Sequence, residues 1–140
     1  MIIKKILGID YGKVITGVSI TDSKQIFAFG INSVLTKNLM TFLDTLMTKN
    51  QIEIIVIGLP KTLKNKIFSI EKLIQKFIFK FLTKYPNIMI ERVDERFTSK
   101  IAFQAMKDLG FKNKHNKKQD ILHQISATII LQSYLSKMKK

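Results

Sequence analysis

Asp10, an aspartate between two glycines, is the residue whose type and position most directly indicate chemistry in this 140-residue chain. It follows an apolar run, Ile2–Ile9, that is typical of a buried strand. Gly8 and Gly12 flank it, and glycines leave room for the backbone of a bulky substrate. A carboxylate at a strand end suits a metal ion that must also meet a phosphate. The alternative is an ordinary turn aspartate, and this short motif alone does not separate the two.

Three further polar side chains are placed where they could join Asp10 at one site. Glu95 follows a predicted strand, and Asp120 begins a predicted last helix that carries His123 one turn further on the same face. Two hard cations about 3.5–4 Å apart can activate water and stabilise a leaving oxygen in phosphodiester hydrolysis. We therefore predict that Asp10, Glu95 and Asp120 are catalytic ligands of Mg²⁺ or Mn²⁺. His123 is the fourth predicted catalytic residue, as a nitrogen ligand or a proton shuttle, and its alternative is an ordinary helix histidine.

Hydrophobic periodicity predicts the elements that must position these residues. Alternating or β-branched apolar runs predict strands at 2–9, 14–21, 25–35, 52–57 and 87–93. Apolar residues at spacings of three and four predict helices at about 36–48, 67–85, 98–109 and 120–135. A meander followed by β–α crossovers gives an α/β fold, a mixed five-stranded sheet with helices on both faces. Residues 1–140 show no repeat and no boundary, which predicts a single domain.

The order of these elements also predicts where the site lies. In such a sheet the first, fourth and fifth strands lie together, and ligands gather at the C-terminal ends of parallel strands. Those ends carry Asp10, the segment 58–60 and the segment 94–95. We therefore expect one edge of the sheet to hold the site.

The charge of the chain indicates a polyanionic partner. Its 24 basic and 10 acidic residues give a net charge of +14, which favours nucleic acid. The alternative explanation of this charge is an A+T-rich genome, which would encode a surface rich in Ile, Lys and Asn in any protein. Basic loops are predicted at 61–66 and 111–119, and the cations expected to hold a phosphate backbone are Lys61, Lys64, Lys66, Arg96, Lys112, Lys114, Lys117 and Lys118.

Composition excludes several classes of protein. A hydrophobic content of 46% is too high for a disordered chain, and the absence of cysteine excludes disulfides and thiolate metal sites. Lysines interrupt every apolar stretch, so no membrane span is expected. The first residues lead directly into strand-like sequence, which is not the pattern of a signal peptide.

Four ordered motifs, covering nearly the whole chain, resemble the YqgF/RuvX family of Holliday-junction-resolvase-like nucleases. They are Leu7–Gly12 with Gly17–Asp22, then Ile57–Lys61, Asp94–Ser99 and Ser126–Leu135. The resemblance implies an RNase H-like fold, a cytoplasmic bacterial protein and a divalent-metal nuclease. It also implies a role in maturing the 5′ end of the small-subunit (16S) rRNA precursor.

Two departures from the family pattern bear on the site. The family's last motif usually carries an aspartate at the position of His123, and Asp120 lies three residues earlier, where it could compensate. The glycine-rich part of the loop after Pro60 is replaced by residues 62–66. The leading interpretation is a nuclease acting on structured RNA. The alternatives are a Holliday junction resolvase acting on branched DNA, which would need two sites and hence a homodimer rather than a monomer, and a nucleic-acid-binding module with weakened catalysis.

Overall fold

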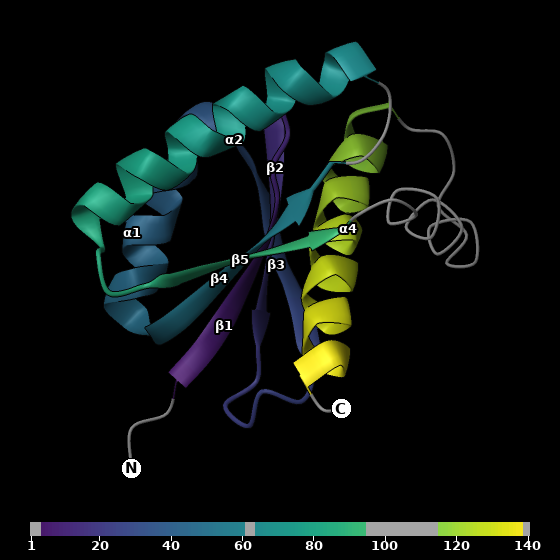
Figure 1. Ribbon diagram of the computed structural model, residues 1–140. Helices are drawn as coiled ribbons and strands as arrows, with labels where there is room; N and C mark the ends of the chain where they lie inside the picture. The colour runs from purple at the N-terminus through teal and green to yellow at the C-terminus, as the bar shows by residue number, and fades with distance from the viewer. Residues whose placement is uncertain (1–3, 61–63, 95–114, 139–140) are drawn as a thin grey trace.

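The computed structural model describes residues 4–60, 64–94 and 115–138, with side chains described at 4–60, 70–94 and 121–138. The strands are β1 (Lys4–Asp10), β2 (Ile15–Thr21), β3 (Ala28–Leu35), β4 (Gln51–Leu59) and β5 (Met89–Asp94). The helices are the short 3₁₀ helix η1 (Thr36–Asn38), α1 (Leu39–Lys49), α2 (Lys64–Lys84) and α4 (His115–Met138). Figure 1 shows the sheet between two helical layers, with α1 and α2 on one side and α4 on the other. Among the residues that the structure describes, none of the helices has the length and apolar composition of a transmembrane span.

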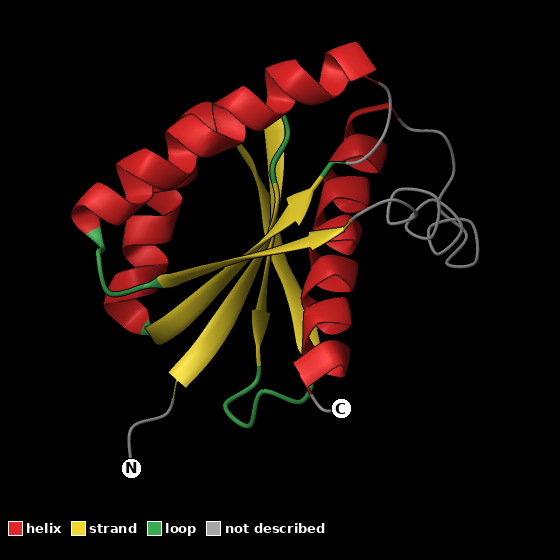
Figure 2. Ribbon diagram, viewed as in Figure 1, coloured by secondary structure: helices red, strands yellow, loops and turns green. Residues whose placement is uncertain are grey.

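The five strands form one mixed sheet in the order β3-β2-β1-β4-β5. β1 and β3 both run antiparallel to β2, whereas β1, β4 and β5 are parallel to one another. The predicted fold class and the predicted neighbourhood of these three parallel strands are confirmed. Figure 2 shows the arrowheads of β4 and β5 pointing the same way, and β1 pairs in parallel with β4, so the C-terminal ends of all three strands share one edge of the sheet.

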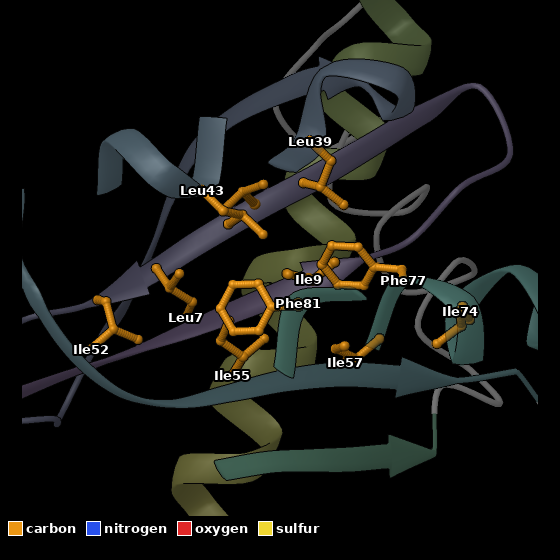
Figure 3. Close-up of a cluster of buried hydrophobic side chains, with 11 residues drawn as sticks. Leu7, Ile9, Leu39, Leu43, Ile52, Ile55, Ile57, Ile74, Phe77 and Phe81 are labelled. Carbon is orange, nitrogen blue, oxygen red and sulfur yellow. The ribbon is translucent and has the colours of Figure 1, made fainter. Parts of the chain in front are cut away.

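Strict alternation along the strands divides the core between the two faces. Leu7 and Ile9 point toward α1 and α2, and Figure 3 shows them in one cluster with residues of both helices, including Leu39, Leu43, Phe77 and Phe81. Ile6 points the opposite way and packs with Ile130 and Leu131 of α4 in a second cluster. Gly8 and Asp10, two and four residues after Ile6, therefore lie on the face that α4 covers.

Three predicted boundaries are wrong. β3 begins at Ala28 rather than at residue 25, because Gln25 has a φ of 56° and the Asp22 carboxylate accepts the amides of Ile26 and Phe27 in a tight turn. α2 begins at Lys64, so the predicted loop at 61–66 is helical over 64–66.

α4 begins at His115, so the predicted loop at 111–119 is helical from 115 onward and Asp120 does not begin the helix. Both α2 and α4 open with lysine-rich and asparagine-rich turns that precede the first apolar repeat. Lysine is a good helix former, but a polar turn carries no hydrophobic period. The helix predicted at 98–109 lies outside the described residues.

Candidate active site

The structure brings two of the four predicted catalytic side chains into contact. Asp10 Oδ2 at the end of β1 lies 3.1 Å from Nδ1 of His123 on α4. Both side chains are mostly buried, with 12% of Asp10 and 24% of His123 exposed. They are 113 positions apart in the sequence, so the contact depends on how α4 docks on the sheet.

α4 reaches Asp10 because glycines let it rest directly on the strand backbone. A Cβ added at Gly17 would lie 1.9 Å from the carbonyl oxygen of His123. One added at Gly8 would lie 2.9 Å from the carbonyl oxygen of Ala127. The Ser19 hydroxyl donates a hydrogen bond of 2.8 Å to that same carbonyl. The glycines of the first motif therefore hold the last helix close enough for His123 to meet Asp10.

Two threonines pin the turn that follows Asp10. The Thr36 hydroxyl donates to the carbonyl of Gly12 at 2.7 Å, and the Thr36 amide donates to the carbonyl of Val14 at 2.8 Å. The fully buried Thr16 hydroxyl lies 2.8 Å from that of Thr36 and accepts the Gly12 amide at 3.4 Å. Sequence reasoning did not identify these threonines, although a polar residue within a buried strand such as Thr16 is a usable signal.

The remaining predicted ligands lie at the limits of the described chain. Asp94 ends β5 opposite Leu59 of β4, at the same edge as Asp10, and Glu95 follows it outside the described residues. Asp120 belongs to α4, but its side chain is not described. Because α4 begins at His115, Asp120 is the sixth residue of the helix and lies beyond the first turn, where the helix dipole acts on a carboxylate. Within the described residues no three His, Asp or Glu side chains form a candidate metal cluster.

The structure describes none of the side chains that were predicted to bind phosphate. Residues 61, 96, 112 and 114 lie outside the described residues. The lysines at 64, 66, 117 and 118 belong to α2 and α4, but their side chains are not described.

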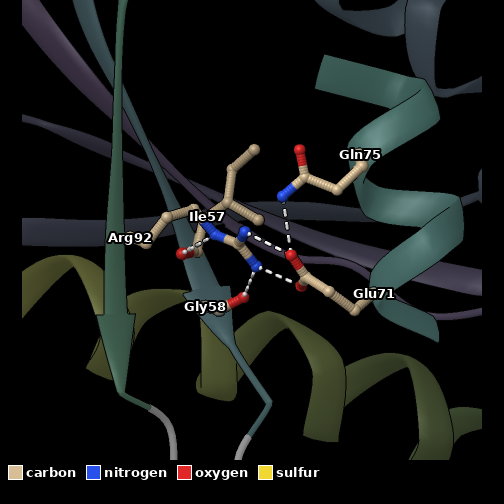
Figure 4. A network of polar contacts seen from close by, with 5 residues as sticks. All are labelled: Ile57, Gly58, Glu71, Gln75 and Arg92. Carbon is tan, nitrogen blue, oxygen red and sulfur yellow. Dashed lines mark hydrogen bonds and ion pairs between the residues drawn. The ribbon is translucent and has the colours of Figure 1, made fainter. Parts of the chain in front are cut away.

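An arginine clip fastens the end of β4, the strand beside Asp10, to α2. Arg92 of β5 forms a paired salt bridge with Glu71, with Nη1 and Nη2 at 2.9 and 2.8 Å from its two carboxylate oxygens (Figure 4). The same guanidinium donates to the carbonyls of Ile57 and Gly58 at 3.3 and 3.0 Å. Gln75 donates to Glu71 at 2.7 Å. The sequence analysis did not identify this arginine clip, which joins the C-terminal ends of β4 and β5 to α2 near the candidate site.

Replacing Glu71 with glutamine should lower the free energy of unfolding by about 1 kcal/mol at pH 7, the upper range for a partly exposed pair of good geometry. Hydrogen bonding to Arg92 holds the pKa of Glu71 below its usual 4.5. A lowered pKa contributes stability above the unfolded-state value, and that contribution is lost as the pH falls through the folded-state value. Urea unfolding of both proteins should therefore show a difference that shrinks between about pH 5 and pH 3. A difference that is independent of pH would assign the effect to packing instead of charge.

A mixed sheet in this order, with an aspartate at the end of its first strand and a late helix covering that aspartate, is the arrangement of an RNase H-like fold. The sequence profile of the RuvX family, described as "Holliday junction resolvase", matches residues 4–137. The chain belongs to the RuvX family.

Relatives with assigned names agree with this placement. A protein of Flavobacterium psychrophilum named "Putative pre-16S rRNA nuclease" is 44% identical over 133 residues, which cover 95% of this chain and 97% of the relative. A protein of the same name from Karelsulcia muelleri is 46% identical over 134 residues, covering 94% of this chain and 97% of the relative.

Solved structures share the fold at low sequence identity. The RuvC of T. thermophilus in complex with a Holliday junction substrate superposes with a TM-score of 0.57 at 10% identity, covering 96% of each chain. The complex of the fowlpox virus resolvase with Holliday junction DNA gives a TM-score of 0.52 at 18% identity, covering 97% of this chain and 99% of the resolvase. At such identities the likeness concerns the fold alone.

Proposed function

We propose that the protein is a divalent-metal-dependent nuclease that processes the 5′ end of pre-16S rRNA during ribosome biogenesis. The observation that carries this proposal is the contact between Asp10 and His123 at the edge where three parallel strands end. Family membership and the nuclease names of the relatives support hydrolysis of phosphodiester bonds. Ribosome biogenesis in a bacterium would place the protein in the cytoplasm.

Asp10 and His123, the two described side chains of the site, can have different chemical roles. Their contact uses Oδ2 of Asp10 and Nδ1 of His123, so Oδ1 and Nε2 are the atoms left to meet a ligand, a water or the substrate. A carboxylate that accepts a hydrogen bond from Nδ1 of an imidazole orients the ring and favours the tautomer with its proton on that nitrogen. His123 can then accept or deliver a proton through Nε2, or supply that nitrogen as a ligand.

The donor set at this edge fits a hard divalent cation in part. Asp10 provides oxygen, the donor that Mg²⁺ and Mn²⁺ prefer, and is held in place by a rigid turn. We propose that Glu95 and Asp120 complete the set, because Glu95 directly follows the end of β5 in the sequence and Asp120 precedes His123 by three positions on α4. Such an ion supplies an activated water and positive charge at the leaving oxygen.

The substrate that we propose is structured RNA, held by electrostatic contacts. A net charge of +14 favours a polyanion, and the basic segments at 61–66 and 112–118 lie just before α2 and α4 or at their starts. We infer that the lysines of these segments and Arg96 contact the phosphate backbone around the cut.

A second candidate is resolution of Holliday junctions in DNA. It is favoured by the shared fold with resolvases solved on junction DNA and by the description of the family. Cutting two symmetric strands requires two sites, so this function predicts a homodimer, whereas cutting one RNA strand is compatible with a monomer.

The test is a comparison of cleavage on two substrates. A precursor of 16S rRNA with its 5′ extension and a four-way DNA junction are incubated side by side with the protein in Mg²⁺ or Mn²⁺, and the products are mapped. We expect metal-dependent cleavage of the RNA extension. Cleavage of the junction alone would support the resolvase, and tight binding without cleavage of either substrate would support a binding module.

A further inference from the structure

A pocket of about 260 Å³ lies on the face of the sheet opposite the candidate active site, between α1 and α2. Its lining comes from the turn after β1, from η1 and the start of α1, and from the middle of α2, and consists of Tyr11, Thr36, Lys37, Leu39, Met40, Leu73, Lys76, Phe77 and Lys80. Figure 3 shows Leu39 of α1 and Phe77 of α2 close to Ile9 in this layer. Because Tyr11 lines it, the pocket lies where β1 ends, on the opposite face of the sheet from Asp10.

The lining combines an apolar floor with a cationic rim. Leu39 and Phe77 are buried, and the ring of Tyr11 lies 5.7 Å from that of Phe77. Three exposed lysines, Lys37, Lys76 and Lys80, surround this floor, and none of the described lining residues is acidic.

This lining matches a nucleotide better than a purely apolar or a purely charged ligand. Bases bind to aromatic surfaces while lysines hold the phosphates on either side. The volume is slightly below the roughly 300–1,000 Å³ of pockets for drug-sized ligands, which suits a single base. Burial raises the pKa of Tyr11, so its phenol stays neutral and can donate a hydrogen bond.

The position of Tyr11 connects this pocket to the candidate active site. Asp10 and Tyr11 are consecutive, and they lie on opposite faces of the sheet because strand side chains alternate. A strand of RNA that crosses the end of β1 would thus place one phosphate near Asp10 and a neighbouring nucleotide near Tyr11.

We propose that this pocket is a binding subsite for one unpaired nucleotide of the RNA strand, with its base on Tyr11 and its flanking phosphates on Lys76 and Lys80. The inference rests on the proposed nuclease function and adds to it the place where the substrate strand is held beside the cut. It also distinguishes between the exposed lysines of α2, since Lys76 and Lys80 line the pocket whereas Lys72 lies outside it.

The experiment measures the affinity of the whole protein for a fluorescent single-stranded RNA 12-mer in EDTA, across a salt series. The Lys76→Ala/Lys80→Ala variant should bind about tenfold more weakly at low salt. Its plot of log affinity against log salt should be flatter by about 1.4, since each single-strand phosphate contact contributes about 0.7. The matched control, Lys49→Ala/Lys72→Ala, also removes two exposed lysines from α1 and α2 and should stay within about twofold of the parent. Crosslinking of 4-thiouridine RNA should modify peptides that contain Tyr11 or Met40.

Equal losses in the two double variants, or crosslinks only outside the pocket, would overturn the subsite. Cleavage of precursor rRNA, measured in parallel, separates this inference from the proposed function. A parent that cleaves, with a pocket variant that binds and cleaves equally well, removes the subsite and leaves the nuclease. A parent that never cleaves but binds RNA through Lys76 and Lys80 removes the nuclease and leaves the subsite.

Discussion

Asp10→Asn should abolish metal-dependent cleavage, with a single-turnover rate at least roughly a thousandfold below that of the parent, the scale on which the loss of one essential group acts. The amide keeps the size of the carboxylate, so the turn pinned by Thr16 and Thr36 should be unchanged. It removes the negative charge that a hard cation requires at this position. Single-turnover cleavage in Mn²⁺, with folding checked by circular dichroism, measures the effect.

His123→Ala is the informative companion to Asp10→Asn, because it leaves the carboxylate in place and removes only its 3.1 Å partner. We expect it to weaken cleavage, by roughly 10²–10⁴-fold if His123 transfers a proton. If Asp10→Asn cleaves like the parent while His123→Ala is inactive, the carboxylate is not the anchor of the site and the assignment is reversed.

Gly17→Ala should cause the second largest effect, because the added methyl has no room. Its Cβ would lie 1.9 Å from the carbonyl oxygen and 2.3 Å from the carbonyl carbon of His123, both of which are backbone atoms of α4. The helix must therefore move away from the sheet, which costs stability at the upper end of the roughly 1–3 kcal/mol typical of overpacking. It also separates His123 from Asp10, so cleavage should fall with stability in urea unfolding and activity assays.

Gly30→Ala provides the matched control on the neighbouring strand. Its Cβ would meet Cγ and Nε2 of the Gln124 side chain at 2.7 and 2.8 Å, and a flexible side chain can rotate away. We expect a change in stability of less than about 1 kcal/mol and near-parental cleavage. Equal damage from both alanines would show that α4 tolerates no added volume anywhere, and would refute a specific role for Gly17 at the site.

The sequence was most informative where chemistry and local pattern coincide. The β-branched run of β4 and the apolar run before Asp10 each identify a buried strand by themselves, and the rules of chain connection then predict that β1 and β4 are neighbours. The same rules predict that Asp10 lies at a strand end shared with β4 and β5. The resemblance to the family marks position 123 as a site residue. The two residues of the contact between Asp10 and His123 could therefore be named from the sequence, whereas the contact itself depends on how α4 docks on the sheet.

Other features depend on packing between distant segments and leave no local pattern. The clip between Arg92 and Glu71 requires the register of β5 against β4, which places the guanidinium beside the carbonyl of Gly58. The start of α4 at His115 was missed because its first turns carry no apolar repeat. Nothing in the sequence distinguishes Lys76 and Lys80 from other exposed helix lysines, since a sequence does not show that α1 and Tyr11 lie opposite them.

The docking of α4 on the glycines of β1 and β2 also sets the time at which the protein can become active during its own synthesis. Residues 8 and 17 are translated early, but their partners at 123–131 follow more than 100 residues later. Contacts of such long sequence separation form late in folding. A nascent chain can pair its strands and pack α1 and α2, yet it lacks the helix that covers Asp10. A nuclease directed at ribosomal RNA would thus remain inert while its chain is still emerging from a ribosome.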